Sequence, residues 1–242
     1  MTTATLDLAL CLEEQARRQA RRQLDRLFPA TGPLRRELYA RSLEFFAAGR
    51  THRLRLLLGG NRTSKSVSGC YEDAVHLSGQ YPAWWEGRRF DHPIKAWVCG
   101  TSDEKIKESV QQVLLGEVGA WGTGLLPGNA LLGVEKAASP IKDLVDTVRV
   151  AHTHGGASLL QFKSYKQGRK AFEASFVDLI HDDEEVPLDI HTEQLLRTMD
   201  TTGTGRREGC LYVTFTPLEG LSETVLEYLP GGELPEGPQP GE

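Results

Sequence analysis

Short apolar runs alternate with amphipathic segments along most of this 242-residue chain. The apolar or alternating runs predict β-strands at 53–58, 94–99, 147–152, 158–163, 176–180 and 210–215. Helical composition, with helix-start and helix-stop residues, predicts helices at 6–28, 34–48, 65–78, from about 103, 167–174, 190–199 and 218–229. From residue 53 onward strands and helices alternate, which predicts an α/β fold with a mainly parallel central sheet flanked by helices.

Three stretches depart from this alternation. The strands at 147–152 and 158–163 flank the turn His154-Gly155-Gly156 and predict a hairpin. The stretch from Gly116 to Pro140 is rich in glycine, and we expect it to be irregular. The last thirteen residues, 230–242, contain four prolines and four glycines, a composition that predicts a linker.

The first predicted strand leads directly into a loop of glycines and small polar residues. This loop nearly fits the phosphate-binding pattern G-x-x-x-x-G-K-[ST], in which backbone N–H groups and the start of the next helix surround a phosphate. The Lys65 ammonium would contact the β- and γ-phosphate oxygens, and the Ser66 hydroxyl would ligate Mg²⁺. The predicted nucleotide-binding residues are Gly59, Gly60, Asn61, Arg62, Thr63, Ser64, Lys65 and Ser66.

One position of the loop departs from the pattern, because Ser64 stands where the pattern has glycine. Glycine is required there only if the backbone adopts a left-handed conformation. Serine is common at helix starts, so we expect Ser64 to be right-handed and its hydroxyl to cap the helix at 65–78.

Four consecutive carboxylates, Asp182 to Glu185, follow the buried run at 176–180. An isolated acidic run is usually a solvated turn. Open α/β sheets, however, collect their ligands at the carboxyl ends of the strands, and a phosphate loop precedes this run. One carboxylate there can hold Mg²⁺ while its neighbour orients or deprotonates water. The order of the two elements therefore predicts nucleotide hydrolysis.

The composition narrows the function further. A net charge of −5 and a pI of about 5.9 exclude coating of nucleic acid by overall charge, so contact with DNA would need a local patch. One such patch is the basic face Arg17, Arg18, Arg21 and Arg22 of the first predicted helix, although a solvated face is the alternative. The four cysteines form no C-x-x-C pair, and no run reaches 18 apolar residues. We expect a soluble intracellular protein without membrane contact.

Several motifs, in this order, resemble those of the large subunit of tailed-bacteriophage terminases, the ATPases that drive DNA into procapsids. GGNRTSKS is similar to the first nucleotide motif of that family, and HLSGQYPAWWEGRRF (76–90) to a segment that follows it in one branch. VDLIHDDEEVP (177–187) is similar to the second motif, and TFTPLEG (214–220) to the motif that couples γ-phosphate sensing to movement. The resemblance covers about 36–229 and implies a P-loop NTPase fold of the RecA/ASCE type.

The resemblance also implies roles for individual residues. Asp183 would be the Mg²⁺-associated aspartate and Glu184 the catalytic carboxylate, with Asp182 in a position that is usually apolar. Thr214 and Thr216 would be coupling residues.

Arginines would complete the site. Arg62 would sense the γ-phosphate or stabilise its charge, although pairing of this loop arginine with a carboxylate is the alternative. Arg169 resembles the arginine that a neighbouring subunit contributes, and Arg206 and Arg207 are competing candidates. Adenine contacts are expected from the segment at 40–53, where Phe45, Phe46 and Arg53 are candidates.

Together these features predict the ATPase motor of a viral terminase, with ATP and Mg²⁺ as cofactors. Double-stranded DNA, the portal protein, the small terminase subunit and further copies of the chain in a ring are the implied partners, in the host bacterial cytoplasm. We divide the chain into an N-terminal helical segment (1–35), an ATPase domain (36–229) and the linker (230–242). The family implies a nuclease domain beyond such a linker, so nuclease activity is not expected here.

Two alternatives remain open. A helicase-like or RecA-like translocase shares the fold and the phosphate loop. A nucleotide-binding assembly module with little hydrolysis is the second alternative, with Ser64 as the cause of its low activity.

Overall fold

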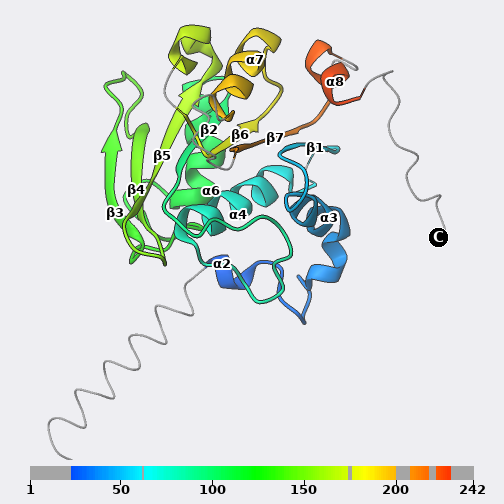
Figure 1. The fold of residues 1–242 in the computed structure, drawn as a ribbon. Coiled ribbons are helices and arrows are strands. Elements are labelled where there is room, and N and C mark those ends of the chain that lie inside the picture. The colour runs from blue at the N-terminus through cyan, green and yellow to red at the C-terminus, as the bar shows by residue number, and fades with distance from the viewer. Residues whose placement is uncertain (1–22, 62, 174–175, 200–207, 218–221, 230–242) are drawn as a thin grey trace, which may run out of the picture.

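The computed structural model describes residues 23–61, 63–173, 176–199, 208–217 and 222–229 (Figure 1). Its strands are β1 (Leu54–Leu58), β2 (Lys95–Gly100), β3 (Leu131–Lys136), β4 (Val145–Ala151), β5 (Ala157–Ser164), β6 (Leu179–Asp183) and β7 (Cys210–Phe215). Its α-helices are α2 (Gln23–Arg26), α3 (Ala40–Ala48), α4 (Lys65–Ser78), α5 (Asp103–Ile106), α6 (Gln112–Leu115), α7 (Leu188–Arg197) and α8 (Glu223–Tyr228). The 3₁₀ helices are η1 (Arg36–Tyr39), η3 (Tyr165–Gln167) and η4 (Arg169–Phe172), and η2 (Lys107–Gln111) is a π-helical turn.

The described strands form one sheet in the order β1-β7-β6-β2-β5-β4-β3. The first five strands are parallel, and β4 and β3 extend the sheet as an antiparallel edge. The predicted α/β fold with a mainly parallel sheet, and the predicted β4–β5 hairpin, are confirmed. Because β1, β7 and β6 are parallel neighbours, the phosphate loop, the TFTPLEG segment and the acidic run all begin at the same edge of the sheet.

Strands β2 and β7 are buried on both faces, which explains their almost continuously apolar sequences. Along β2, Ala96 and Val98 belong to the core shared with α3 and α4, whereas Trp97 and Cys99 belong to the core shared with α7 and α8. Figure 1 shows these helix pairs on opposite sides of the sheet. Burial of each large apolar side chain contributes about 1.5–3 kcal/mol, so the two cores fix the position of every strand that carries a site residue.

A buried ion pair attaches α4 to β1. The Arg55 guanidinium donates to both carboxylate oxygens of Glu72, at 3.0 and 2.7 Å, and both side chains are buried. His76 Nε2 lies 3.1 Å from the same carboxylate. Gly79, at φ 69°, ends the helix in the left-handed conformation that glycine adopts without strain. The phosphate loop is thus held between two elements that are bonded to each other.

Strand β3 lies within the stretch from Gly116 to Pro140, so the expectation that this stretch is irregular is wrong for residues 131–136. Its partly buried Leu131 and Val134 pack on the core, but Gly133 and two register shifts against β4 interrupt the apolar pattern. An edge strand with so few apolar positions gives a weak sequence signal.

The described part of the N-terminal helical segment includes α2, from the end of the helix expected at 6–28. The basic face at 17–22 and the linker at 230–242 lie outside the described residues, and the division of the chain at 35/36 and 229/230 stays a prediction. Among the helices that are described, none has the length and apolar character needed to cross a bilayer.

Candidate nucleotide-binding and hydrolysis site

The loop between β1 and α4 is curled around the carbonyl oxygen of Gly60. The Thr63 hydroxyl donates to this oxygen at 2.8 Å, and the Lys65 ammonium donates to it at 2.6 Å. A Cβ on Gly59 would lie 2.8 Å from Thr63 Oγ1, so a larger residue at this position would displace the Thr63 side chain. The Lys65 side chain therefore lies along the inside of the loop, at the start of α4, where a phosphate-binding lysine would be needed.

Ser64 has φ 61° and ψ 20°, which is a left-handed conformation. Its hydroxyl makes no capping hydrogen bond to the helix, so the expected right-handed, capping serine is wrong. The left-handed residue is the N-cap of α4, directly before Lys65. With a Cβ the conformation costs about 1–2 kcal/mol, which explains why the pattern has glycine here.

Asp183, at the end of β6, has both carboxylate oxygens fixed. Thr214, its direct neighbour on β7, donates from Oγ1 to Asp183 Oδ1 at 2.9 Å. The Ser109 hydroxyl donates to Asp183 Oδ2 at 3.0 Å. Ser109 lies in η2, a wide π-type turn between α5 and α6, and such turns are often found at functional sites. Ser109 is not among the residues predicted from the sequence, because no local pattern marks a contact across 74 positions.

Glu184 follows in an unusual backbone conformation, with φ 102°. Its N–H donates to the Thr214 carbonyl at 2.9 Å, and its own carbonyl accepts from the Tyr165 hydroxyl at 3.2 Å. Partial burial and the neighbouring Asp183 charge raise the pKa of the Glu184 carboxyl. Strained residues of this kind persist where the surroundings hold them, often at active sites.

The loop lysine and the two acids lie close enough to influence one another. Partial burial lowers the pKa of Lys65, and the Glu184 and Asp183 carboxylates oppose this shift. The structure therefore brings the predicted phosphate-binding lysine and the predicted metal and catalytic carboxylates together. Ser66, the other predicted Mg²⁺ ligand, lies in the first turn of α4.

Asp182 points away from this site, which separates it from the rest of the acidic run. Its Oδ1 accepts hydrogen bonds from Gln194 Nε2 at 2.7 Å and from the Tyr165 hydroxyl at 3.2 Å. Burial raises its pKa to about 6. Because alternate residues of a strand face opposite sides of the sheet, Asp183 faces α4 and Asp182 faces α7.

The two predicted coupling residues contact different parts of the site. Thr214 holds Asp183, as described above, and the Thr216 hydroxyl donates to Asn61 Oδ1 in the phosphate loop at 3.1 Å. Strand β7 and the residue that follows it therefore contact both the acid and the loop.

Of the four arginines predicted to complete the site, Arg169 lies within the described residues. Arg169, in η4, is 54% exposed and donates through Nη2 and Nε to Glu193 Oε2 in α7, at 2.9 and 3.1 Å. Arg62, Arg206 and Arg207 lie outside the described residues.

The adenine-contact candidates are occupied by other partners. The rings of Phe45 and Phe46 are buried in the core. The Arg53 guanidinium donates to Thr198 Oγ1 at 2.7 Å and pairs with Glu208 at 3.3 Å.

The chain is 31% identical to the terminase large subunit of Salmonella phage P22, over an alignment of 212 residues that covers 79% of this chain. It is a homologue of the terminase large subunits. The match spans about 41% of the length of that relative. The resemblance inferred from the sequence motifs is confirmed.

A structural comparison also matches the large terminase of a thermophilic bacteriophage, with a TM-score of 0.46 and 8% sequence identity. This match covers 73% of the present chain and 37% of the other. No protein-family model matches the chain.

Proposed function

We propose that the chain is the ATPase motor part of a viral DNA-packaging machine, and that it couples hydrolysis of Mg-ATP to translocation of double-stranded DNA into a procapsid. The observation that supports this most strongly is the convergence of Lys65, Asp183 and Glu184 at one sheet edge, in a homologue of terminase large subunits. We further propose that it acts with a portal protein and a small terminase subunit, as a ring of copies in the host cytoplasm.

The donor set suits magnesium. Mg²⁺ prefers hard oxygen ligands and is usually held by one or two protein groups together with substrate phosphates. Asp183 and Ser66 would supply these oxygens, and the hydrogen bonds from Ser109 and Thr214 orient the carboxylate in advance. When bound, the ion would neutralise charge that develops on the β- and γ-phosphates.

The remaining residues would divide the chemistry. Backbone N–H groups of the loop and the Lys65 ammonium hold the phosphates, and Arg62 senses the γ-phosphate. Glu184 orients the attacking water and accepts its proton, and its raised pKa makes it a stronger base than an ordinary glutamate. Thr216, through Asn61, transmits a change in the loop to β7.

An arginine from a neighbouring copy would complete the site, and Arg169 is our candidate. To reach another subunit it has to leave Glu193, to which it is bonded within its own chain. An arginine supplied in trans is worth about 10³–10⁵ in turnover, so an isolated copy would be nearly inactive. Inactive Arg169→Ala chains mixed with inactive Glu184→Ala chains should then regain partial activity at their shared interfaces. Recovery with Arg206→Ala or Arg207→Ala chains, but not with Arg169→Ala chains, would assign the role to that loop instead.

Phosphate release from Mg-ATP, with and without double-stranded DNA, tests the proposal as a whole, with Glu184→Gln as the inactive control. We expect turnover by the wild-type chain that rises with concentration and with DNA. Nucleotide binding without turnover at any concentration would favour the alternative of a nucleotide-binding assembly module. The strained backbone of Ser64 is the observation that keeps this alternative open.

A further inference from the structure

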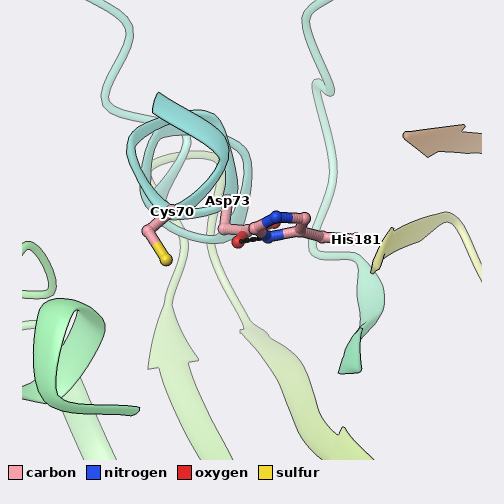
Figure 2. A group of neighbouring side chains, drawn as sticks. All are labelled: Cys70, Asp73 and His181. Atoms are coloured by element: carbon pink, nitrogen blue, oxygen red, sulfur yellow. Dashed lines mark hydrogen bonds and ion pairs between the residues drawn. The ribbon is translucent and has the colours of Figure 1, made fainter. Parts of the chain in front are cut away.

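Behind the candidate site, buried polar side chains form a continuous series of hydrogen bonds from α4 to Asp183. His181 Nδ1, on β6, lies 2.7 Å from Asp73 Oδ2 on α4, and His181 Nε2 lies 3.0 Å from Thr214 Oγ1. Thr214 then donates to Asp183 at 2.9 Å. We call this series, Asp73–His181–Thr214–Asp183, the buried relay. Figure 2 shows the Asp73 carboxylate directed at the His181 ring.

The relay has a defined direction. The Thr214 hydroxyl has one proton, which it donates to Asp183, so it accepts from N–H at His181 Nε2. The Asp73 carboxylate accepts at its Oδ2 from His181 Nδ1, while its Oδ1 accepts from the Tyr212 hydroxyl at 2.6 Å. Every polar atom of the histidine ring is therefore used, and the ring has one orientation.

The sequence of α4 makes room for this ring. Gly69 stands inside the helix, where glycine is unfavourable, and a Cβ there would lie 2.4 Å from His181 Cε1 and Nε2. The same glycine offers its carbonyl to the Tyr212 hydroxyl at 3.2 Å. The helix thus carries an unfavourable residue at the place where the histidine needs space.

A metal site is the other use that these residues could have, since Cys70, Asp73 and His181 place ligand atoms within 4.8 Å of one another. Both ring nitrogens of His181 and both oxygens of Asp73 already have hydrogen-bond partners. Burial also raises the pKa of the Cys70 thiol well above its ordinary value, which disfavours the thiolate that a metal would need. The cluster therefore favours a hydrogen-bonded support over a metal centre.

We propose that His181 is a positioning residue that links α4, and so the phosphate loop at its start, to the metal-binding carboxylate of Asp183. The inference rests on the nucleotide site proposed above. Through Thr214, the imidazole holds the Asp183 carboxylate in the orientation that the ion requires. Loss of the histidine should therefore weaken the contribution of Mg²⁺ to nucleotide binding, and leave binding of the nucleotide alone unchanged.

The test measures ADP affinity by calorimetry with and without Mg²⁺, on the wild-type chain and on His181→Phe and His181→Gln. In His181→Phe we expect the gain in affinity from Mg²⁺ to fall about tenfold or more, while affinity without Mg²⁺ changes less than about threefold. Glutamine can place an N–H donor toward Thr214 and should recover part of the gain.

His76→Phe is the matched control. His76 is equally buried on α4 and is bonded to Glu72, but it lies outside the relay. If His181→Phe and His76→Phe lose the Mg²⁺ dependence equally, His181 has only a structural role, and the proposal is wrong. If His181→Phe does not fold, Gly69→Ala, which keeps every relay side chain but displaces the ring, should show the same loss. An unchanged Mg²⁺ dependence in the folded variant overturns the proposal, whereas failure of the wild-type chain to bind ADP overturns the nucleotide site itself.

Discussion

Replacing Ser64 by glycine should tighten nucleotide binding. Ser64 is left-handed, with φ 61°, and its hydroxyl makes no capping bond that the change would remove. The loop it belongs to is largely exposed and is held by the contacts of Thr63 and Lys65 with Gly60. In solution the nucleotide-free loop can leave the strained conformation, whereas the loop closed on a phosphate cannot.

The size of the effect follows from two opposing terms. A Cβ in the left-handed region costs about 1–2 kcal/mol, which glycine does not incur. Glycine is more flexible, and ordering it costs about 0.5–1 kcal/mol more than ordering another residue. The central values leave a net gain of about 0.8 kcal/mol, or roughly fourfold in affinity, with an upper limit of about 1.5 kcal/mol, or roughly twelvefold.

Calorimetric titration with Mg-ADP measures this gain without interference from turnover. Ser64→Ala is the control, because it keeps the Cβ and removes the hydroxyl, and it should bind as the wild type does. If the nucleotide-free loop also stays left-handed, the same gain should appear as a higher free energy of unfolding in urea. The reasoning is refuted if Ser64→Gly raises neither quantity, or if Ser64→Ala raises the affinity as much.

Three further outcomes can be checked. Glu184→Ala should lower turnover by about 10²–10⁴-fold with Mg-ADP affinity nearly unchanged, while Glu185→Ala remains active; the opposite result would shift the catalytic assignment by one residue. Arg55→Met leaves the buried Glu72 carboxylate without its cationic partner, so the free energy of unfolding in urea should fall by about 3–5 kcal/mol. Burial lowers the pKa of His191 from 6.5 to about 4, so its contribution to stability is complete above pH 6.5 and is lost as the pH falls toward 4. His191→Phe should flatten the dependence of the free energy of unfolding in urea on pH between 6.5 and 4. An unchanged slope would contradict the assignment of this pH dependence to His191.

The sequence predicted the elements with a strong local signal. Helix α4 begins and ends at the predicted residues, Lys65 and Ser78, because a loop of small residues precedes it and Gly79 ends it. Strands β2 and β7 were predicted because strands buried on both faces are almost continuously apolar, whereas β6 begins at Leu179, three residues later than the predicted run at 176–180, and includes Asp182 and Asp183. The edge strand β3, broken by Gly133, lacks this signal.

The site was predicted less completely, because much of it depends on contacts between distant segments. The left-handed Ser64 and the Ser109 hydroxyl on Asp183 follow from the path of the chain, which no local pattern specifies. His181 did leave a signal, since a polar side chain in a strand buried on both faces must find a hydrogen-bond partner. Its partners, Asp73 and Thr214, lie 108 and 33 positions away and could be named only from the fold.

The position of β7 in the sheet explains why the predicted coupling residues would lie at the end of this strand and just after it. Strand β7 separates β1, which leads into the phosphate loop, from β6, which carries the acids. Thr214 and Thr216 are two residues apart, yet one is bonded to Asp183 and the other to Asn61 of the loop. In the proposed hydrolysis site, a change in the distance between loop and acid, as when a γ-phosphate is lost, would therefore act on both hydroxyls. Strand β7 lies between the two halves of the site. It is thus the shortest connection through which hydrolysis could shift the residues that follow the strand.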